Sequence, residues 1–186
     1  SGSISVTITS PDPDATIYYT TNGNAPDNGD NLYTGPITIN NTQVIRARAY
    51  SSNPDVLQSQ IETNTYFIDD EHSLYVLSIT GTQVDNLLNG NNWIEPWGVV
   101  ELFDTDQNLI DEGTGEFNKH GNDSWAYDQR GFDYIMRDEF GQNYAIRDQI
   151  FPTKSRDRFQ RLIIKAAAND NYPFEQGAHI RDAYIH

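Results

Sequence analysis

Short runs of alternating apolar and polar residues, separated by Gly, Pro, Asn and Asp, recur along most of this chain. Because side chains on a strand point to opposite faces in turn, such runs are typical of half-buried strands joined by turns. The stretch Gly113–Asp148 shows the pattern most fully, with a polar strand, a Gly/Asn loop, a second alternating strand and a turn at Glu139–Gln142. We therefore predict a mainly β protein.

The first part of the chain predicts a small β-sandwich. Its runs are short and regularly spaced, and turns such as Thr21-Asn22-Gly23 separate them, a pattern typical of immunoglobulin-like sandwiches. The runs are 4–8, 15–20, 37–39, 44–50 and 61–68. A charged segment without an apolar pattern, Asp69–His72, follows them. We expect it to join a first domain, residues 1–68, to a second domain, residues 69–186.

The second domain is expected to be an antiparallel α+β domain. Its runs predict strands at 73–80, 97–103, 109–118, 132–137 and 159–167. Thr82 is placed to cap a short helix that ends at Leu88, since threonine is a favoured N-cap residue. A second helix is expected from Gly177, where apolar residues return at helical spacing. Because that helix stops at His186, we expect the fragment to end inside a larger domain.

The charge of the chain limits its partners. A net charge of −15 repels nucleic acid and anionic membranes, so we exclude both. The acid excess suits either the solubility of a secreted protein or the binding of divalent cations, and composition leaves both open. The chain has no Cys, which excludes disulfides, zinc–thiolate sites and a Cys nucleophile. No apolar run approaches the roughly 20 residues needed to span a bilayer.

The loop after the strand that ends near Asn118 is the candidate ligand loop. It gathers His120, Gly121, Asn122 and Asp123, and its glycine permits close approach of a ligand. Turn formation explains the same residues equally well. No Ser/His/Asp arrangement and no HExxH spacing occurs, so we predict no catalytic residue and no metal ligand.

The first domain resembles the chitobiase/β-hexosaminidase C-terminal type domain, also called a fibronectin III-associated domain. The residues that carry the resemblance are Thr16–Gly23, Pro26, Tyr33–Ile37, Ile45–Tyr50 and Thr65-Tyr66. The resemblance implies an accessory spacer of large secreted bacterial proteins, with no catalytic residues. Four tyrosines have two interpretations, a sugar-binding platform or core and corner positions; they are Tyr18, Tyr19, Tyr33 and Tyr50.

The second domain resembles the first part of the CotH kinase family, atypical kinases of the spore-coat type. The carrying segments are Leu74–Ile79, Trp97–Asp104, Gly115–Ser124, Gln129–Phe132, Asp138–Gly141, Phe151, Leu162–Ala166, Asn169-Asp170 and Ile180–Ala183. The resemblance implies ATP and Mg²⁺ as cofactors of the full-length protein. The family usually has a Lys near Arg130, and its Mg²⁺-holding acids come beyond the position of His186. We therefore expect this fragment to be inactive by itself.

Two functions follow as hypotheses. In the first, the parent is a secreted or cell-surface kinase that phosphorylates extracytoplasmic proteins, and this fragment covers the nucleotide through Lys119, Arg130 and Lys165. In the second, the fragment is a non-catalytic module for adhesion or for binding a surface glycan. A solvent-exposed row of Tyr18, Tyr33 or Trp97 would favour the second.

Overall fold

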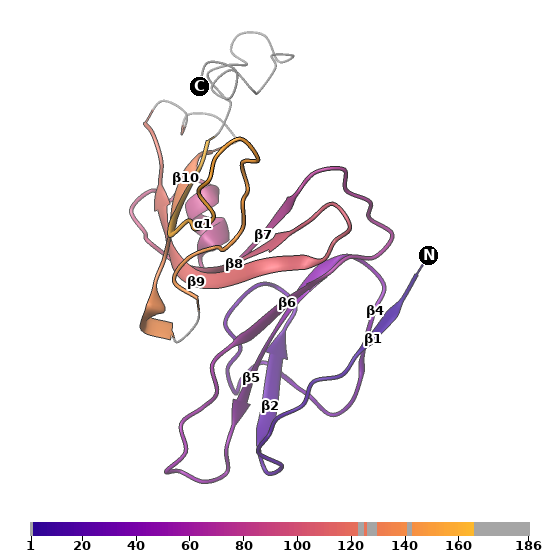
Figure 1. Ribbon diagram of the computed structural model, residues 1–186. Coiled ribbons are helices and arrows are strands. Elements are labelled where there is room, and N and C mark those ends of the chain that lie inside the picture. The colour runs from indigo at the N-terminus through magenta and orange to yellow at the C-terminus, as the bar shows by residue number, and fades with distance from the viewer. Residues whose placement is uncertain (1, 123–124, 126–129, 141–142, 166–186) are drawn as a thin grey trace.

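The computed structural model describes residues 2–122, 125, 130–140 and 143–165, and it is mainly β, as the alternating pattern predicts. Figure 1 shows two groups of strands, an N-terminal sandwich (β1–β6) and a C-terminal sheet (β7–β11) that carries the helix α1. The elements are β1 (Ile4–Val6), β2 (Thr16–Thr20), β3 (Asn31–Leu32), β4 (Ile37–Ile39), β5 (Gln43–Tyr50), β6 (Glu62–Tyr66), β7 (Val76–Thr80), α1 (Val84–Leu88), β8 (Trp97–Phe103), β9 (Leu109–Lys119), β10 (Phe132–Met136), the 3₁₀ turn η2 (Asp138–Phe140) and β11 (Arg161–Ile164).

The N-terminal sandwich consists of two antiparallel sheets that share one core. β1 pairs with β4 in the smaller sheet, and the larger has the order β3-β2-β5-β6. Val6 and Ile39 of the smaller sheet pack with Ile45 of β5 and with Ile68, and all four are buried. Apolar side chains from two facing sheets thus enclose the core, as the short alternating runs predict.

The C-terminal sheet is an antiparallel meander in the order β11-β10-β9-β8-β7. One of its faces is covered by α1, whose Val84 and Leu87 are buried against Val100, Phe117 and Tyr134 of the sheet. Alternation along β8 turns Val99, Glu101 and Phe103 to the opposite face, and these three are buried as well.

That opposite face is buried because the sandwich packs on it, where β6 meets β8. Phe67 beyond β6 lies edge-on to Phe103 of β8, with ring centroids 5.0 Å apart, and its ring also meets His72 at 5.3 Å. Beside these rings the buried carboxylate of Glu101 accepts hydrogen bonds from the Thr65 backbone N–H (3.0 Å) and the Thr65 hydroxyl (2.6 Å). The contact between the two groups of strands therefore has an aromatic part and a charged part.

The prediction that Thr82 caps α1 is wrong. The N-cap position of α1 is Gln83, which makes no side-chain capping hydrogen bond. The Thr82 hydroxyl instead accepts a hydrogen bond from the backbone N–H of Ala25 in the sandwich, at 2.8 Å. A local capping signal was thus overridden by a contact with a residue 57 positions earlier in the chain.

Several predicted strands are shorter in the described structure, including β1, which ends at Val6, and β6, which covers Glu62–Tyr66. The strand expected over 73–80 begins only at Val76, and the one expected from Phe159 begins at Arg161. Phe159 forms a single bridge with Ile146 instead. Residues 166–186, including the predicted terminal helix, lie outside the described residues, as does the end of the turn expected at Glu139–Gln142, which begins within η2.

Candidate functional site

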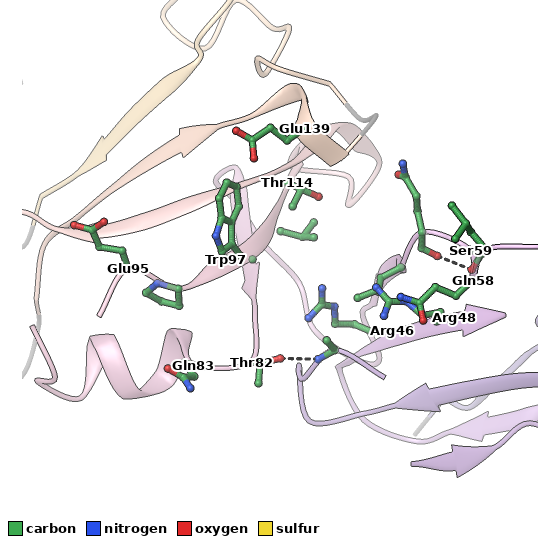
Figure 2. A pocket seen from close by; sticks show the side chains of 17 residues that line it. Arg46, Arg48, Gln58, Ser59, Thr82, Gln83, Glu95, Trp97, Thr114 and Glu139 are labelled. Carbon is green, nitrogen blue, oxygen red and sulfur yellow. Dashed lines mark hydrogen bonds between the residues drawn. The ribbon is translucent and has the colours of Figure 1, made fainter. Parts of the chain in front are cut away.

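A groove of about 690 Å³ lies where the N-terminal sandwich meets the C-terminal sheet. Its volume is within the range of sites for small molecules, which is about 300–1,000 Å³. Figure 2 shows its two walls, with Arg46 and Arg48 on the sandwich side and Trp97, Glu95 and Glu139 on the sheet side. Side chains from distant parts of the sequence therefore face one space.

The sandwich wall is formed by β5 and by the segment that runs beside it. Positions 46 and 48 lie on the same face of β5 because they are two residues apart on a strand. Ser59 fixes the neighbouring segment, because its backbone N–H donates to Ala49 O and its hydroxyl accepts from the Ala49 N–H, both at 2.9 Å. Gln58 and Gln60, on either side of Ser59, are exposed and line the groove.

The sheet wall centres on Trp97, the first residue of β8. Trp97 has the same parity as the buried Val99 and Glu101, but it lies beyond the edge of the sandwich, and 40% of its surface stays exposed. Glu95 and Glu139, both exposed, lie on either side of it in Figure 2. An exposed indole ring beside carboxylate acceptors gives this wall both an apolar face and hydrogen-bonding groups.

Two acids, one buried and one half-buried, lie on the face of the sheet that packs against the sandwich. Burial raises the pKa of Glu101, and the hydrogen bonds from Thr65 oppose that rise. Its cross-strand neighbour on β9, Glu112, is half-buried. Burial raises the pKa of Glu112 to about 7, and the charges of Glu62, Glu101 and Asp111 add to the effect. This part of the interface therefore takes up protons more readily than ordinary carboxylates do.

The four tyrosines of the sandwich do not form an exposed row, since each is half-buried. Tyr18 and Tyr50 pack edge-to-face with ring centroids 5.7 Å apart, and Tyr19 packs against the core of the sandwich. The hydroxyl of Tyr33 accepts a hydrogen bond from the backbone N–H of Ile8, at 3.0 Å. Of the two interpretations given for these residues, these contacts match core and corner positions.

The structure brings two of the three predicted phosphate-binding residues together. Lys119 and Arg130 both approach the ring of Trp125, at 5.6 Å and 5.9 Å from its centroid. Arg130 also donates a hydrogen bond to the Leu88 carbonyl at the end of α1, at 2.9 Å. Exposure alternates along Arg161–Lys165, which groups Lys165 with the residues directed away from the helix-covered face. Lys165 therefore does not share the Lys119–Arg130 side.

The candidate ligand loop is described in part. His120 Nδ1 lies 2.8 Å from Oδ1 of Asp133, a buried residue of β10. Gly121 has φ = 79°, a left-handed backbone conformation that favours glycine over other residues. Trp125 closes the base of the loop by donating from Nε1 to the carbonyls of His120 and Gly131. Asn122 is exposed, and Asp123 lies outside the described residues.

These surroundings do not by themselves make the nucleotide site that the CotH resemblance implies. One predicted cation is used at the end of a helix, and another lies on the other side of the sheet. In the described part of the chain, no group of three or more His, Asp or Glu residues is arranged to hold a metal ion. The roles of Lys119, Arg130 and Lys165 with ATP and Mg²⁺ stay predictions.

The sequence pattern indicated a residue of the sheet wall of the groove but none of the sandwich wall. The glycan hypothesis expects Trp97 to be exposed, and it is exposed. Arg46 and Arg48 were not singled out, although they are the only Lys or Arg residues before Lys119. That isolation in an acidic sequence was the available signal. Nothing in the local pattern of Gln58 or Gln60 marks them as groove residues.

No helix among the described residues is long and apolar enough to cross a membrane.

Comparison with known families matches residues 1–57 to the chitobiase/beta-hexosaminidase C-terminal domain. This supports the first resemblance, and the second, to the CotH kinase family, gains no support from it. No curated protein and no solved structure matches the chain. The first 57 of the 186 residues therefore resemble a chitobiase/beta-hexosaminidase C-terminal domain.

Proposed function

We propose that this protein is a non-catalytic carbohydrate-binding module of a secreted or cell-surface protein, and that the groove between sandwich and sheet holds a short oligosaccharide. The exposed face of Trp97 beside the groove's polar side chains carries the proposal. The C–H groups on one face of a sugar ring are apolar and pack on the electron-rich face of an indole. The hydroxyl groups around the ring then need hydrogen-bonding partners.

The groove supplies both hydrogen-bond donors and hydrogen-bond acceptors. Carboxylates accept hydrogen bonds from sugar hydroxyls, amides do both, and guanidinium groups donate. Here the acceptors are Glu95 and Glu139, the amides are Gln58 and Gln60, and the guanidinium groups belong to Arg46 and Arg48. The matching family model carries the names of two glycosidases, which makes carbohydrate the ligand class to test first.

The test uses intrinsic fluorescence and calorimetry with a panel of oligosaccharides that includes chito-oligosaccharides. The fluorescence signal is read in a Trp93→Phe background that removes the most exposed of the three Trp residues, and the affinities of the Trp→Ala variants are measured by calorimetry in the otherwise unchanged chain. We expect Trp97→Ala to weaken binding about fivefold or more, because one stacked ring contributes about 1–3 kcal/mol.

Trp93→Ala is the matched control, since Trp93 is 92% exposed and does not line the groove. It should leave the affinity unchanged. Equal loss in the two variants, or binding that survives Trp97→Ala intact, contradicts a site at the groove. If no saccharide in the panel binds, the proposal fails.

Nucleotide binding is the second candidate, and one observation favours it. Lys119 and Arg130, predicted from separate segments, converge on Trp125. In this candidate the parent protein phosphorylates extracytoplasmic proteins and uses ATP with Mg²⁺. Calorimetric titration with Mg²⁺-ATP tests it, and binding that falls in Lys119→Ala supports it. If the wild-type protein produces no heat, these two residues are left with the structural role that their contacts describe.

A further inference from the structure

The distribution of charge in the groove is unusual for this chain. The net charge is −15, and the Lys and Arg residues among the first 118 positions are Arg46 and Arg48 alone. Both line the groove. Because they are two positions apart on β5, they lie on the same face of the strand. The two arginines of the first 118 residues of this acidic protein therefore lie together at the candidate site.

Neither guanidinium group has a direct carboxylate partner in the part of the chain that the structure describes. Within the described residues, no Asp or Glu oxygen lies within ion-pair distance of Arg46 or Arg48. Arg46 is 5% exposed and is held in place by hydrogen bonds to the Gly23 carbonyl (2.9 Å) and the Thr63 hydroxyl (3.2 Å). Its direct partners are thus neutral, and its charge is retained at the groove wall.

Arg48 is the more accessible of the two, being half-buried. Its Nε atom is buried and has no hydrogen-bond partner in the described part of the chain. Burial, together with the charge of Arg48, lowers the pKa of Arg46 to about 10, while the charge of Glu101 opposes the change. Arg46 therefore remains protonated at neutral pH, and the two guanidinium groups repel one another across the same wall.

We propose that the natural ligand of the groove is an anionic oligosaccharide, whose carboxylate or sulfate group contacts the Arg46–Arg48 wall while a ring of the same chain stacks on Trp97. This inference rests on the proposed carbohydrate function. An anion at that wall relieves the repulsion between the two guanidinium groups and gives the Arg48 donors an acceptor. Glu95 and Glu139 on the facing wall accept hydrogen bonds from neutral hydroxyls.

The experiment compares ligands that differ only in charge. Calorimetry at low salt measures the affinity of an oligogalacturonate and of its methyl ester, and of a sulfated galactan oligosaccharide and its desulfated form. These pairs distinguish carboxylate from sulfate recognition. We expect at least one acidic ligand to bind about tenfold or more tightly than its neutral partner, and added salt to reduce that preference.

Variants locate the effect. Arg48→Gln should lower the affinity for the acidic ligand by a larger factor than the affinity for its neutral partner, and so remove most of the preference. Arg48→Lys keeps the charge and should retain part of the preference, which separates loss of charge from misfolding. Arg147→Gln changes the net charge equally at an exposed position outside the groove, and it should leave both affinities unchanged.

The outcomes separate this inference from the proposed function. If neutral saccharides bind through Trp97 and no acidic ligand binds more tightly, the anionic preference is wrong and the carbohydrate function stands. An equal effect of Arg147→Gln and Arg48→Gln also overturns the preference, because the groove arginines would then have no special role. If the neutral and acidic saccharides all fail to bind, the proposed function and the inference fail together.

Discussion

Replacing Thr65 by valine tests the contact between sandwich and sheet most directly. Valine keeps the shape of threonine and removes its hydroxyl. That hydroxyl donates to the Glu101 carboxylate at 2.6 Å and lies 2.6 Å from the Ser78 hydroxyl. Glu101 is 2% exposed, so water does not replace the lost donor. One hydrogen bond to a buried charged group contributes about 1.5–3 kcal/mol, and we expect the free energy of unfolding to fall by that amount.

The loss should also depend on pH. Burial holds the pKa of Glu101 above its ordinary value, and the Thr65 hydroxyl opposes that rise, so its removal raises the pKa further. A carboxyl group whose pKa is raised in the folded state stabilises the protein at low pH and loses that contribution as the pH rises. The deficit of the valine variant should therefore be larger at about pH 8 than at about pH 5.5.

Urea denaturation followed by circular dichroism measures both effects. Thr38→Val, at an exposed position of β4 whose side chain points away from the core, is the control and should change the free energy of unfolding by less than about 0.5 kcal/mol. The reasoning is refuted if the Thr65 variant costs no more than the Thr38 variant. It is also refuted if the Thr65 deficit is the same at both pH values.

Three further variants test other parts of the structure. Glu112→Gln should stabilise the protein at about pH 8 and have little effect near pH 4.5, because the pKa of Glu112, raised to about 7 by burial, makes the wild type lose stability over that interval. Since Glu112 is half-exposed, solvent screening reduces the gain to about 1 kcal/mol. Denaturation curves across the pH range measure it. A difference in unfolding free energy between variant and wild type that does not change with pH would contradict the raised pKa of Glu112. Gly115→Ala should destabilise by about 1–3 kcal/mol or more, since a Cβ there would lie 2.3 Å from the Ile135 carbonyl oxygen, whereas Gly35→Ala, with nothing within 4 Å, should be nearly neutral in the same assay. Arg130→Gln should cost about 1–2 kcal/mol through loss of the bond to Leu88 O at the end of α1, and unchanged thermal stability would instead leave Arg130 available for the phosphate role.

Local patterns in the sequence predicted most of the strands. The run Trp97–Phe103 is a strand with those bounds, and Asp104 begins the turn after it. The Asp104 carboxylate accepts hydrogen bonds from the backbone N–H groups of Asp106 and Asn108, as expected for an Asx turn. Alternation and turn chemistry depend on neighbours within a few residues, which is why a single sequence sufficed for these elements.

Reasoning from local sequence failed where a side chain bonds to a residue far away in the chain instead of to its neighbours. Thr82 has the chemistry of an N-cap, but its hydroxyl accepts from Ala25 across the interface. Glu101 looks like an ordinary charged residue within a strand, and only the packing of β6 against β8 buries it and surrounds it with the donors of Thr65. Neither outcome follows from the residues beside these positions in the chain.

The sequence by itself determined the β class of the protein, the alternation of its strands and the isolation of Arg46 and Arg48 in an acidic chain. Only the tertiary structure decided that these two arginines face Trp97 across a groove. It also decided that Lys119 and Arg130 meet at Trp125 while Lys165 belongs to the other side of the sheet. The physical reason is the same in each case. The pattern along a strand fixes which residues share a face, but the packing of one sheet on another fixes what that face meets.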